Sequence, residues 1–230
     1  MLTLYSYPEL FGLADNNPYG LKLFAFLRLA GLAFRHEHIF DAKAAPRGQL
    51  PYIVDEGETI GDSDAIIAHL IGKYRLTIDA ALTPAQRTTG HLVRRTLDDL
   101  YWVMSYSRWH DPRCWPLFRD QVLKTHANIS EADLAAARKY NSDRYYYQGI
   151  GRYAPDEAYA RGIADLQALA DLIGDGGFLF GATPGGIDAA LYGSIANIHF
   201  FAIDTPLEQS VAAHPNLVRH CLAIHGAVTG

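Results

Sequence analysis

The chain has 230 residues, of which 49% are hydrophobic and 20% charged, and its formal net charge at pH 7 is −5. This balance is typical of globular proteins and argues against disorder, and the length suffices for one large domain or two small ones. Acidic and basic residues are interspersed without a basic stripe, so the sequence predicts no nucleic-acid partner.

The N-terminal residues are not expected to form a targeting segment. Residues 1–4 lead directly into a predicted strand and lack the basic and apolar regions of a signal peptide. No apolar run approaches the roughly 20 residues that cross a bilayer, so no membrane insertion is expected. The two cysteines, Cys114 and Cys221, are too few for a disulfide framework, which favours a cytoplasmic location.

The ten histidines prompt a search for a metal site. His36 and His38 fall on one face of a predicted strand, and His220 and His225 are five residues apart on a predicted helix. Neither pair has a carboxylate or a cysteine at a familiar ligand spacing, so we expect no metal.

The first elements in the chain form a strand-helix-strand unit. Residues 2–7 alternate between apolar and polar side chains and end at Pro8, which predicts a strand. Asn17 and Pro18 are favoured at the N-cap and first position of a helix, and Gly31 ends it. Residues 34–40 alternate again and predict a second strand, parallel to the first through a right-handed crossover.

A hairpin and a short helix follow. Residues 52–54 and 58–60 predict two strands joined by a tight turn at Glu56-Gly57. Ser63 is the expected N-cap of an apolar helix over residues 65–70. Residues 1–76 are therefore expected to form a thioredoxin-like domain, a four-stranded mixed sheet with helices on its faces.

The hairpin and the helix together suit a small zwitterionic peptide. The free amides of a helix that begins at Ser63 favour a carboxylate, and Asp62 can pair with an ammonium group. If the bond before Pro51 is cis, the backbone of Leu50 is turned outward to pair with an extended ligand. The alternative is an ordinary hairpin followed by a capped helix.

Strand signals almost vanish after residue 74. Residues 75–83 read as a linker, and Pro84 begins a long helix with an aromatic end that runs to Trp115. Ser130 and Asp133 resemble a capping box, and further helices are expected from Asp156, Ile187 and Pro215. Residues 84–230 are therefore expected to form an all-helical second domain.

Several of these phrases resemble one known family. Gln49-Leu50-Pro51, the hairpin and Asp62-Ser63 with Ala65-Ile66 resemble the glutathione-binding half of the glutathione S-transferase superfamily. Residues 17–22, 149–152, 178–181 and 188–193 resemble its branch of failed-axon-connections and metaxin-like proteins. The resemblance implies the two-domain fold described above, a cis bond at Pro51, and Asp62 and Ser63 holding the γ-glutamyl end of glutathione.

The resemblance also indicates where the chemistry belongs. The family turns the thiol of glutathione into the nucleophilic thiolate, using Ser, Tyr or Cys at the end of the first strand or the start of the first helix. Here Asn17 stands at the Ser position and Gly20 at the Cys position of the branch's motif. An Asn amide donates hydrogen bonds to a thiolate but exchanges no proton. We therefore expect Asn17 either to stabilise the thiolate or only to cap its helix. Tyr7 is an alternative thiolate stabiliser. Because the motif's usual Ser hydroxyl and Cys thiol are both missing, disulfide exchange is not expected.

Other positions extend the implied site. Lys43 and Arg47 are expected to reach the glycyl carboxylate of glutathione. The aromatic end of the long helix is expected either to form the wall of the electrophile pocket or to pack in the core; its residues are Tyr101, Trp102, Tyr106 and Trp109. Asp188 is expected to stabilise the start of a later helix by its charge.

The sequence thus predicts a cytoplasmic homodimer that binds glutathione as a co-substrate and transfers it to a small hydrophobic electrophile or a peroxide. A second hypothesis is an adaptor or binding protein that keeps the glutathione S-transferase fold without catalysis. A third, weaker hypothesis is a protein that has lost glutathione altogether.

Overall fold

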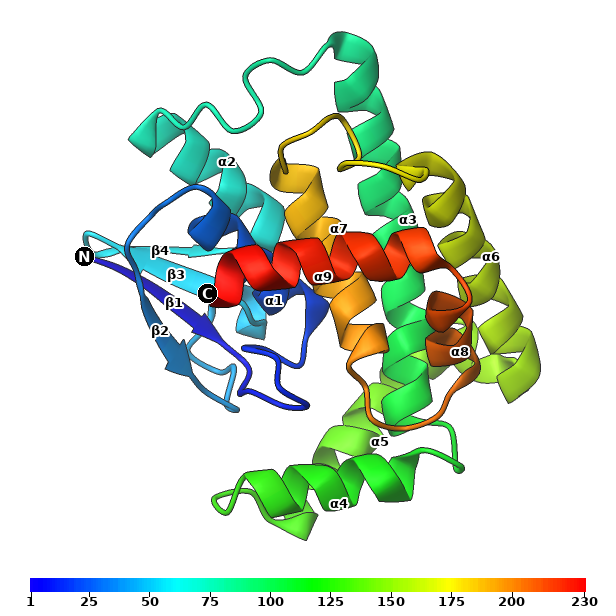
Figure 1. Ribbon diagram of the computed structural model, residues 1–230. Coiled ribbons are helices and arrows are strands. Elements are labelled where there is room, and N and C mark those ends of the chain that lie inside the picture. The colour runs from blue at the N-terminus through cyan, green and yellow to red at the C-terminus, as the bar shows by residue number, and fades with distance from the viewer.

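The computed structural model describes all residues from 1 to 230 (Figure 1). Its first part contains four strands and two longer helices: β1 (Leu2–Ser6), α1 (Pro18–Leu29), β2 (Arg35–His38), η1 (Pro46–Gly48), β3 (Tyr52–Asp55), β4 (Glu58–Gly61) and α2 (Ser63–Tyr74). The remainder is helical: α3 (Pro84–Trp109), α4 (Trp115–Thr125), α5 (Glu131–Gln148), η2 (Ile150–Arg152), α6 (Pro155–Ile173), α7 (Gly186–His199), α8 (Pro206–Ala212) and α9 (Pro215–Thr229).

The sheet has the strand order β2-β1-β3-β4, with β1 and β2 parallel and the other neighbours antiparallel. The predicted four-stranded mixed sheet followed by a helical part is therefore confirmed. The second strand is shorter than expected, since only residues 35–38 of the predicted 34–40 pair with β1.

The two faces of the sheet are covered differently. Leu2, Leu4 and Ile53 point into the main hydrophobic core, where α1 and α2 pack. On the opposite face Tyr5 stacks on Tyr52 at a ring separation of 4.6 Å, and both pack with residues of the 42–50 segment. Helices are thus not on both faces as expected, because a loop with the short η1 covers the second face.

Local capping signals set most helix starts. Asn17 Oδ1 accepts a hydrogen bond from the Tyr19 N–H at 3.0 Å, with Pro18 at the first helical position, as the sequence predicts. Ser63 is not the N-cap of α2. Asp62 takes that place, and its Oδ1 accepts from the backbone N–H groups of Asp64 and Ala65. Both residue types are good N-caps, and the one that directly follows β4 is used.

The helical part differs from the expectation at two places. The long helix α3 ends at Trp109, so Trp115 is not its end but the first residue of α4. Helix α8 has no counterpart among the helices expected from the sequence. The remaining starts match, including the reciprocal capping box between Ser130 and Asp133 at α5.

The hydrophobic core runs through both parts of the chain without interruption. Helix α1 packs chiefly against α7, and Figure 1 shows α9 lying across both. The approach of α1 to α7 is close: a Cβ atom on Gly193 would lie 2.4 Å from the carbonyl oxygen of Pro18. The division into residues 1–76 and 84–230 stays a prediction. None of the helices combines the length and the apolar character that crossing a bilayer requires.

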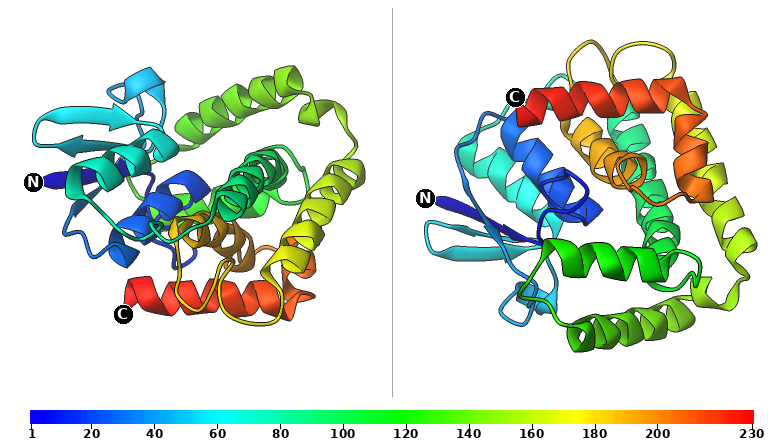
Figure 2. Two further views of the ribbon diagram at one scale, coloured as in Figure 1. Left: turned by 90° about the horizontal axis from the view of Figure 1, so that it is seen from above. Right: turned by 60° about the horizontal axis from the view of Figure 1, so that its bottom comes forward.

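Helices α4 and α5 lie apart from the other helices at the bottom of Figure 1, and the second view of Figure 2 brings them forward. They contact the rest of the molecule mainly through α3 and η2. This placement leaves a space between α4, α5 and the sheet.

Candidate functional site

The strand register brings the predicted binding residues to one edge of the sheet. Tyr5 pairs with Tyr52, and Tyr52 pairs with Gly61. Tyr7 follows the end of β1, the Leu50–Pro51 pair precedes β3, and the Asp62-Ser63 pair follows β4. Because β3 runs antiparallel to its two neighbours, all of these residues lie at the same edge.

The backbone and side chains of this edge have a defined geometry. The Leu50–Pro51 peptide bond is cis. The exposed carboxylate of Asp62 caps α2 with one oxygen and lies 3.4 Å from Arg47 Nη2 with the other. Ser63 is buried, and its Oγ accepts a hydrogen bond of 3.0 Å from Lys22 Nζ.

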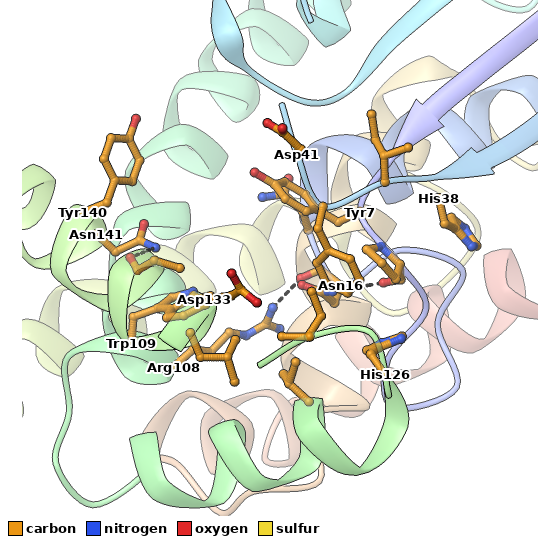
Figure 3. A pocket seen from close by; sticks show the side chains of 18 of the residues that line it. Tyr7, Asn16, His38, Asp41, Arg108, Trp109, His126, Asp133, Tyr140 and Asn141 are labelled. Carbon is orange, nitrogen blue, oxygen red and sulfur yellow. Dashed lines mark hydrogen bonds between the residues drawn. The ribbon is translucent and has the colours of Figure 1, made fainter. Parts of the chain in front are cut away.

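A cleft of about 1410 Å³ opens beside this edge (Figure 3). Tyr7, Asn17, Lys43 and Tyr52 line it on the sheet side, and α3, α4 and α5 supply the opposite wall. Leu50, Pro51, Asp62, Ser63 and Arg47 do not line the cleft itself. The structure thus gathers the predicted binding residues at one edge but places only Lys43 among them in the cleft.

The two candidate thiolate stabilisers, Asn17 and Tyr7, both line the cleft. The Oδ1 atom of Asn17 caps α1, so its amide nitrogen remains free to donate. Burial, followed by the charges of neighbouring groups, raises the pKa of Tyr7 to about 12. Its phenol therefore stays neutral near pH 7 and is a hydrogen-bond donor rather than a base.

Arg108 is the cation at the floor of the cleft. It is buried, with 4% of its surface exposed, and its guanidinium donates to the carbonyl oxygen of Asn16 (Figure 3) and to that of Asn197. Burial lowers its pKa to about 10, so it remains charged at neutral pH. The charge is held beside the loop that leads into Asn17, where a thiolate would be stabilised.

The four aromatic residues predicted for the electrophile pocket lie in three different places. Tyr101 and Trp109 line the cleft. Tyr106 is only 1% exposed and packs in the core, where its hydroxyl faces the carbonyl of Tyr153. Trp102 lines a different, smaller cavity between α3, η2 and α6. Successive residues of one helix point in different directions, so an aromatic run supplies only part of any one wall.

The remaining wall of the cleft is more polar than the sequence suggested. Helix α5 contributes Tyr140, Asn141 and Arg144, and His126 stands at the end of α4. The Arg144 guanidinium lies over the ring of Trp102 at 5.0 Å. No group of three or more His, Cys, Asp or Glu side chains is arranged to hold a metal ion. His36 instead forms a 2.7 Å hydrogen bond with Ser6 Oγ.

Comparison with known proteins identifies this arrangement. Residues 18–114 match the glutathione S-transferase N-terminal domain, and residues 162–224 match the glutathione S-transferase C-terminal domain. Over 206 residues the chain is 31% identical to the isoprene-epoxide–glutathione S-transferase of Rhodococcus sp. (strain AD45), covering 86% of this chain and 87% of that protein. The chain belongs to the glutathione S-transferase superfamily.

One further relative and one solved structure are also similar to the chain. The chain is 29% identical over 244 residues to Failed axon connections of Drosophila melanogaster, which covers 96% of this chain but only 56% of that longer relative. Its fold resembles that of a glutathione S-transferase of Ceriporiopsis subvermispora in complex with glutathione, with a TM-score of 0.61, 15% identity, and coverage of 98% of this chain and 97% of that one. The superfamily expected from the motifs is confirmed, and the first of these matches supports the expected branch.

Asp188 has a structural role in this fold, because it connects three segments by hydrogen bonds. Its Oδ2 accepts from the Gly185 N–H at 2.8 Å, and its Oδ1 accepts from the Leu179 N–H and from His220 Nε2. Asp188 is 1% exposed. The residue therefore joins the 178–181 loop, the start of α7 and helix α9, which is more than the charge effect predicted from the sequence.

Sequence reasoning missed two buried ionisable residues near the site, Asp15 and Lys22, and did not anticipate the burial of a third, Arg108. A signal existed for Lys22, because it interrupts the apolar run of α1 between Leu21 and Leu23. No local signal distinguishes Arg108 from an exposed arginine on α3, since its partners come from distant segments.

Proposed function

We propose that this glutathione S-transferase binds glutathione at the edge of the sheet and transfers it, as the thiolate, to a small electrophile held in the adjoining cleft. The observation that carries the proposal is the convergence of Tyr7, Asn17 and the Arg108 guanidinium on the cleft, next to the edge that carries Pro51 and Asp62.

The chemistry requires an anionic sulfur. A free thiol with a pKa near 8.5 is only a few per cent ionised at pH 7, whereas the thiolate is the nucleophile. The Asn17 amide and the Tyr7 hydroxyl supply neutral donors, and Arg108 supplies a fixed positive charge in a buried setting. Each of these favours the thiolate over the thiol and so lowers the pKa of the bound ligand.

The rest of glutathione fits the same edge. In this proposal the γ-glutamyl ammonium pairs with Asp62, its carboxylate meets Ser63 at the start of α2, and the backbone of Leu50 pairs with the cysteinyl residue. Lys43 lines the cleft and is suited to the glycyl carboxylate. Arg47 already pairs with the Asp62 carboxylate, so we assign the glycyl carboxylate to Lys43 rather than to Arg47.

An epoxide is the first class of electrophile to test, because the Rhodococcus relative is named for isoprene epoxide. Tyr101 and Trp109 offer apolar surface for such a molecule, and the cleft is large compared with it. Thiolate attack on a ring carbon opens the carbon–oxygen bond, and the resulting alkoxide takes up a proton from water or a cleft donor.

A specific observation favours the second hypothesis, a glutathione-binding adaptor without turnover. The positions of the branch's Ser and Cys at the start of α1 offer neither a hydroxyl nor a thiol, because Asn17 and Gly20 occupy them. The nearby Tyr19 hydroxyl donates to Asp98. The chain is also similar to Failed axon connections of Drosophila melanogaster, whose name does not describe an enzyme.

The proposal also includes the predicted homodimer, the cytoplasmic location and a peroxide as an alternative substrate class. Light scattering of the purified chain tests the dimer.

One experiment separates the hypotheses. Calorimetric titration with glutathione measures binding, and conjugation of a small epoxide followed by loss of free thiol measures turnover. Binding with turnover supports the enzyme, binding without turnover on several electrophiles supports the adaptor, and no binding refutes both.

A further inference from the structure

Lys22 is a buried cation beneath the start of α2. It lies on α1 with only 7% of its side chain exposed, in a helix whose other residues are mostly apolar. An ammonium group removed from water requires partners, and Lys22 has two, the hydroxyl of Ser63 and the carboxylate of Asp64. Burial lowers the pKa of Lys22, and the neighbouring Asp64 opposes that shift.

The contact fixes the role of the Ser63 hydroxyl. An ammonium group has no lone pair, so it only donates, and Ser63 Oγ accepts from Lys22 Nζ at 3.0 Å. The single hydroxyl hydrogen of Ser63 is then left to donate elsewhere, and no acceptor of the protein takes it. Ser63 is therefore held as a donor.

The backbone of Ser63 adds a second donor. Asp62 caps the N–H groups of Asp64 and Ala65, and no acceptor of the protein pairs with the N–H of Ser63, the first residue of α2. Two donors on one residue at the positive end of a helix match the two oxygens of a carboxylate. A neutral amide offers only one strong acceptor and no charge.

The cations near this point, Lys22, Arg47, Arg94 and Arg95, outnumber the carboxylates Asp62, Asp64 and Asp98 by one. Asp64 pairs with Lys22 but also lies near Arg94 and Arg95, whose charges help to keep its pKa low despite the opposing effect of burial. Asp62 is in contact with Arg47. Lys22 is the only one of these cations that contacts Ser63 directly.

We propose that Lys22 is a positioning residue that, through Ser63, makes the site select a ligand whose γ-glutamyl residue carries a free α-carboxylate. The inference rests on the proposed function, in which glutathione occupies this edge of the sheet. Lys22 does not touch the ligand; it lies one hydroxyl group away and acts through the direction of the Ser63 hydrogen and through its charge.

The test changes the ligand and the protein in turn and compares the effect of each ligand change between protein variants. Three ligands are titrated calorimetrically: glutathione, glutathione with a carboxamide in place of the γ-glutamyl α-carboxylate, and glutathione with a carboxamide in place of the glycyl carboxylate. For the wild-type protein we expect the α-carboxamide to bind about tenfold more weakly or worse, as expected for a carboxylate near a partly buried cation. In Lys22→Met, which keeps the unbranched side chain to its fourth atom and removes the ammonium group, that ratio should fall below about twofold.

Two controls make the cycle specific. The loss caused by the glycyl carboxamide should be the same in Lys22→Met and in the wild type. Lys22→Arg, which keeps the charge, should retain most of the α-carboxamide penalty, whereas general damage to the site would weaken the binding of all three ligands together. If Lys22→Met fails to fold, as judged by circular dichroism, Ser63→Ala removes the same relay and should also reduce the ratio.

The outcomes are distinguishable. An α-carboxamide penalty that is unchanged in Lys22→Met, or in Ser63→Ala where Lys22→Met does not fold, overturns the inference while leaving the proposed function standing. Failure of the wild-type protein to bind glutathione overturns the proposed function and this inference with it. A penalty lost from Lys22→Met and kept in Lys22→Arg supports both.

Discussion

The carboxyl group of Asp15 occupies the space that a side chain at position 20 would need. A Cβ atom on Gly20 would lie 1.6 Å from Asp15 Oδ2. Asp15 is fully buried, and its Oδ1 accepts a 2.6 Å hydrogen bond from the Asn17 N–H. The branch's usual cysteine therefore has no room here, which gives a steric reason for the glycine found in the sequence.

This contact predicts that Gly20→Ala destabilises the protein. Alanine is favoured over glycine within a helix by about 1 kcal/mol, but here the added methyl group overlaps Asp15. Overpacking of a buried site costs about 1–3 kcal/mol, so we expect a net loss in the free energy of unfolding, measured by urea denaturation.

Gly72 provides the matched control for that substitution. It also lies within a helix, α2, but a Cβ atom there would meet nothing within 4 Å. Gly72→Ala should therefore leave stability unchanged or raise it by up to about 1 kcal/mol. Equal effects of the two substitutions would show that Asp15 does not restrict position 20.

Asp15 also predicts a pH dependence of stability. Burial raises its pKa to about 8, against an ordinary value near 3.9 in the unfolded chain. Between about pH 4 and pH 8 the folded state therefore holds a proton that the unfolded state has released. The contribution of the neutral carboxyl to stability is complete below about pH 4 and is lost as the pH rises through about 8, by up to about 1.4 kcal/mol per pH unit.

Asp15→Asn isolates this contribution, because an asparagine keeps the acceptor for the Asn17 N–H and does not titrate. We expect the variant to gain stability relative to the wild type as the pH is raised from 5 to 8, measured by urea denaturation in steps of one pH unit. Parallel stability curves for the two proteins would mean that Asp15 is ionised in the folded state.

Asp188 should be among the most sensitive carboxylates to substitution. Asp188→Ala leaves the N–H groups of Gly185 and Leu179 and the His220 ring without their buried partner. Loss of one member of a buried pair costs about 3–5 kcal/mol. Asp133 stands at the equivalent third position of α5 but is exposed, so Asp133→Ala should cost about 1 kcal/mol or less in the same denaturation measurement. Similar losses for both would contradict the structural role of Asp188.

The features that the sequence predicted correctly depend on local interactions. Asn17 caps the helix that Pro18 begins, and Glu56-Gly57 turns the hairpin, because each signal lies within a few residues of the structure it forms. The period-2 register then fixes which ends of the strands meet, and so places Pro51 beside Asp62.

The features that the sequence did not predict depend on distant partners. The Arg108 guanidinium is paired with Asn16 and Asn197, which are 92 and 89 residues away along the chain. The same applies to Lys22 and Ser63, which are 41 residues apart. A helical periodicity marks which face of α3 is apolar, but it does not show that an arginine on that face finds carbonyl groups to bind.

Asn17 is the residue on which the catalytic hypothesis depends, and three substitutions separate its two roles. Asn17→Ser keeps a side-chain acceptor for the Tyr19 N–H and adds a hydroxyl, so stability and turnover should both be retained. Asn17→Asp keeps the cap but loses the amide donor and places a negative charge beside the sulfur. We therefore expect wild-type stability, a raised pKa of the bound thiol, and kcat/KM for epoxide conjugation lower by about 100-fold.

Asn17→Ala completes the series, because it removes the cap and the donor together. It should lower the free energy of unfolding by about 1 kcal/mol and also reduce turnover. At saturating glutathione, the pH profile of kcat/KM for the epoxide reports the ionisation of the thiol in the enzyme–glutathione complex, so its acid limb should move to higher pH in Asn17→Asp and in Asn17→Ala but not in Asn17→Ser. An Asn17→Asp variant with an unshifted acid limb would assign Asn17 to capping alone and leave Tyr7 and Arg108 as the groups that stabilise the thiolate.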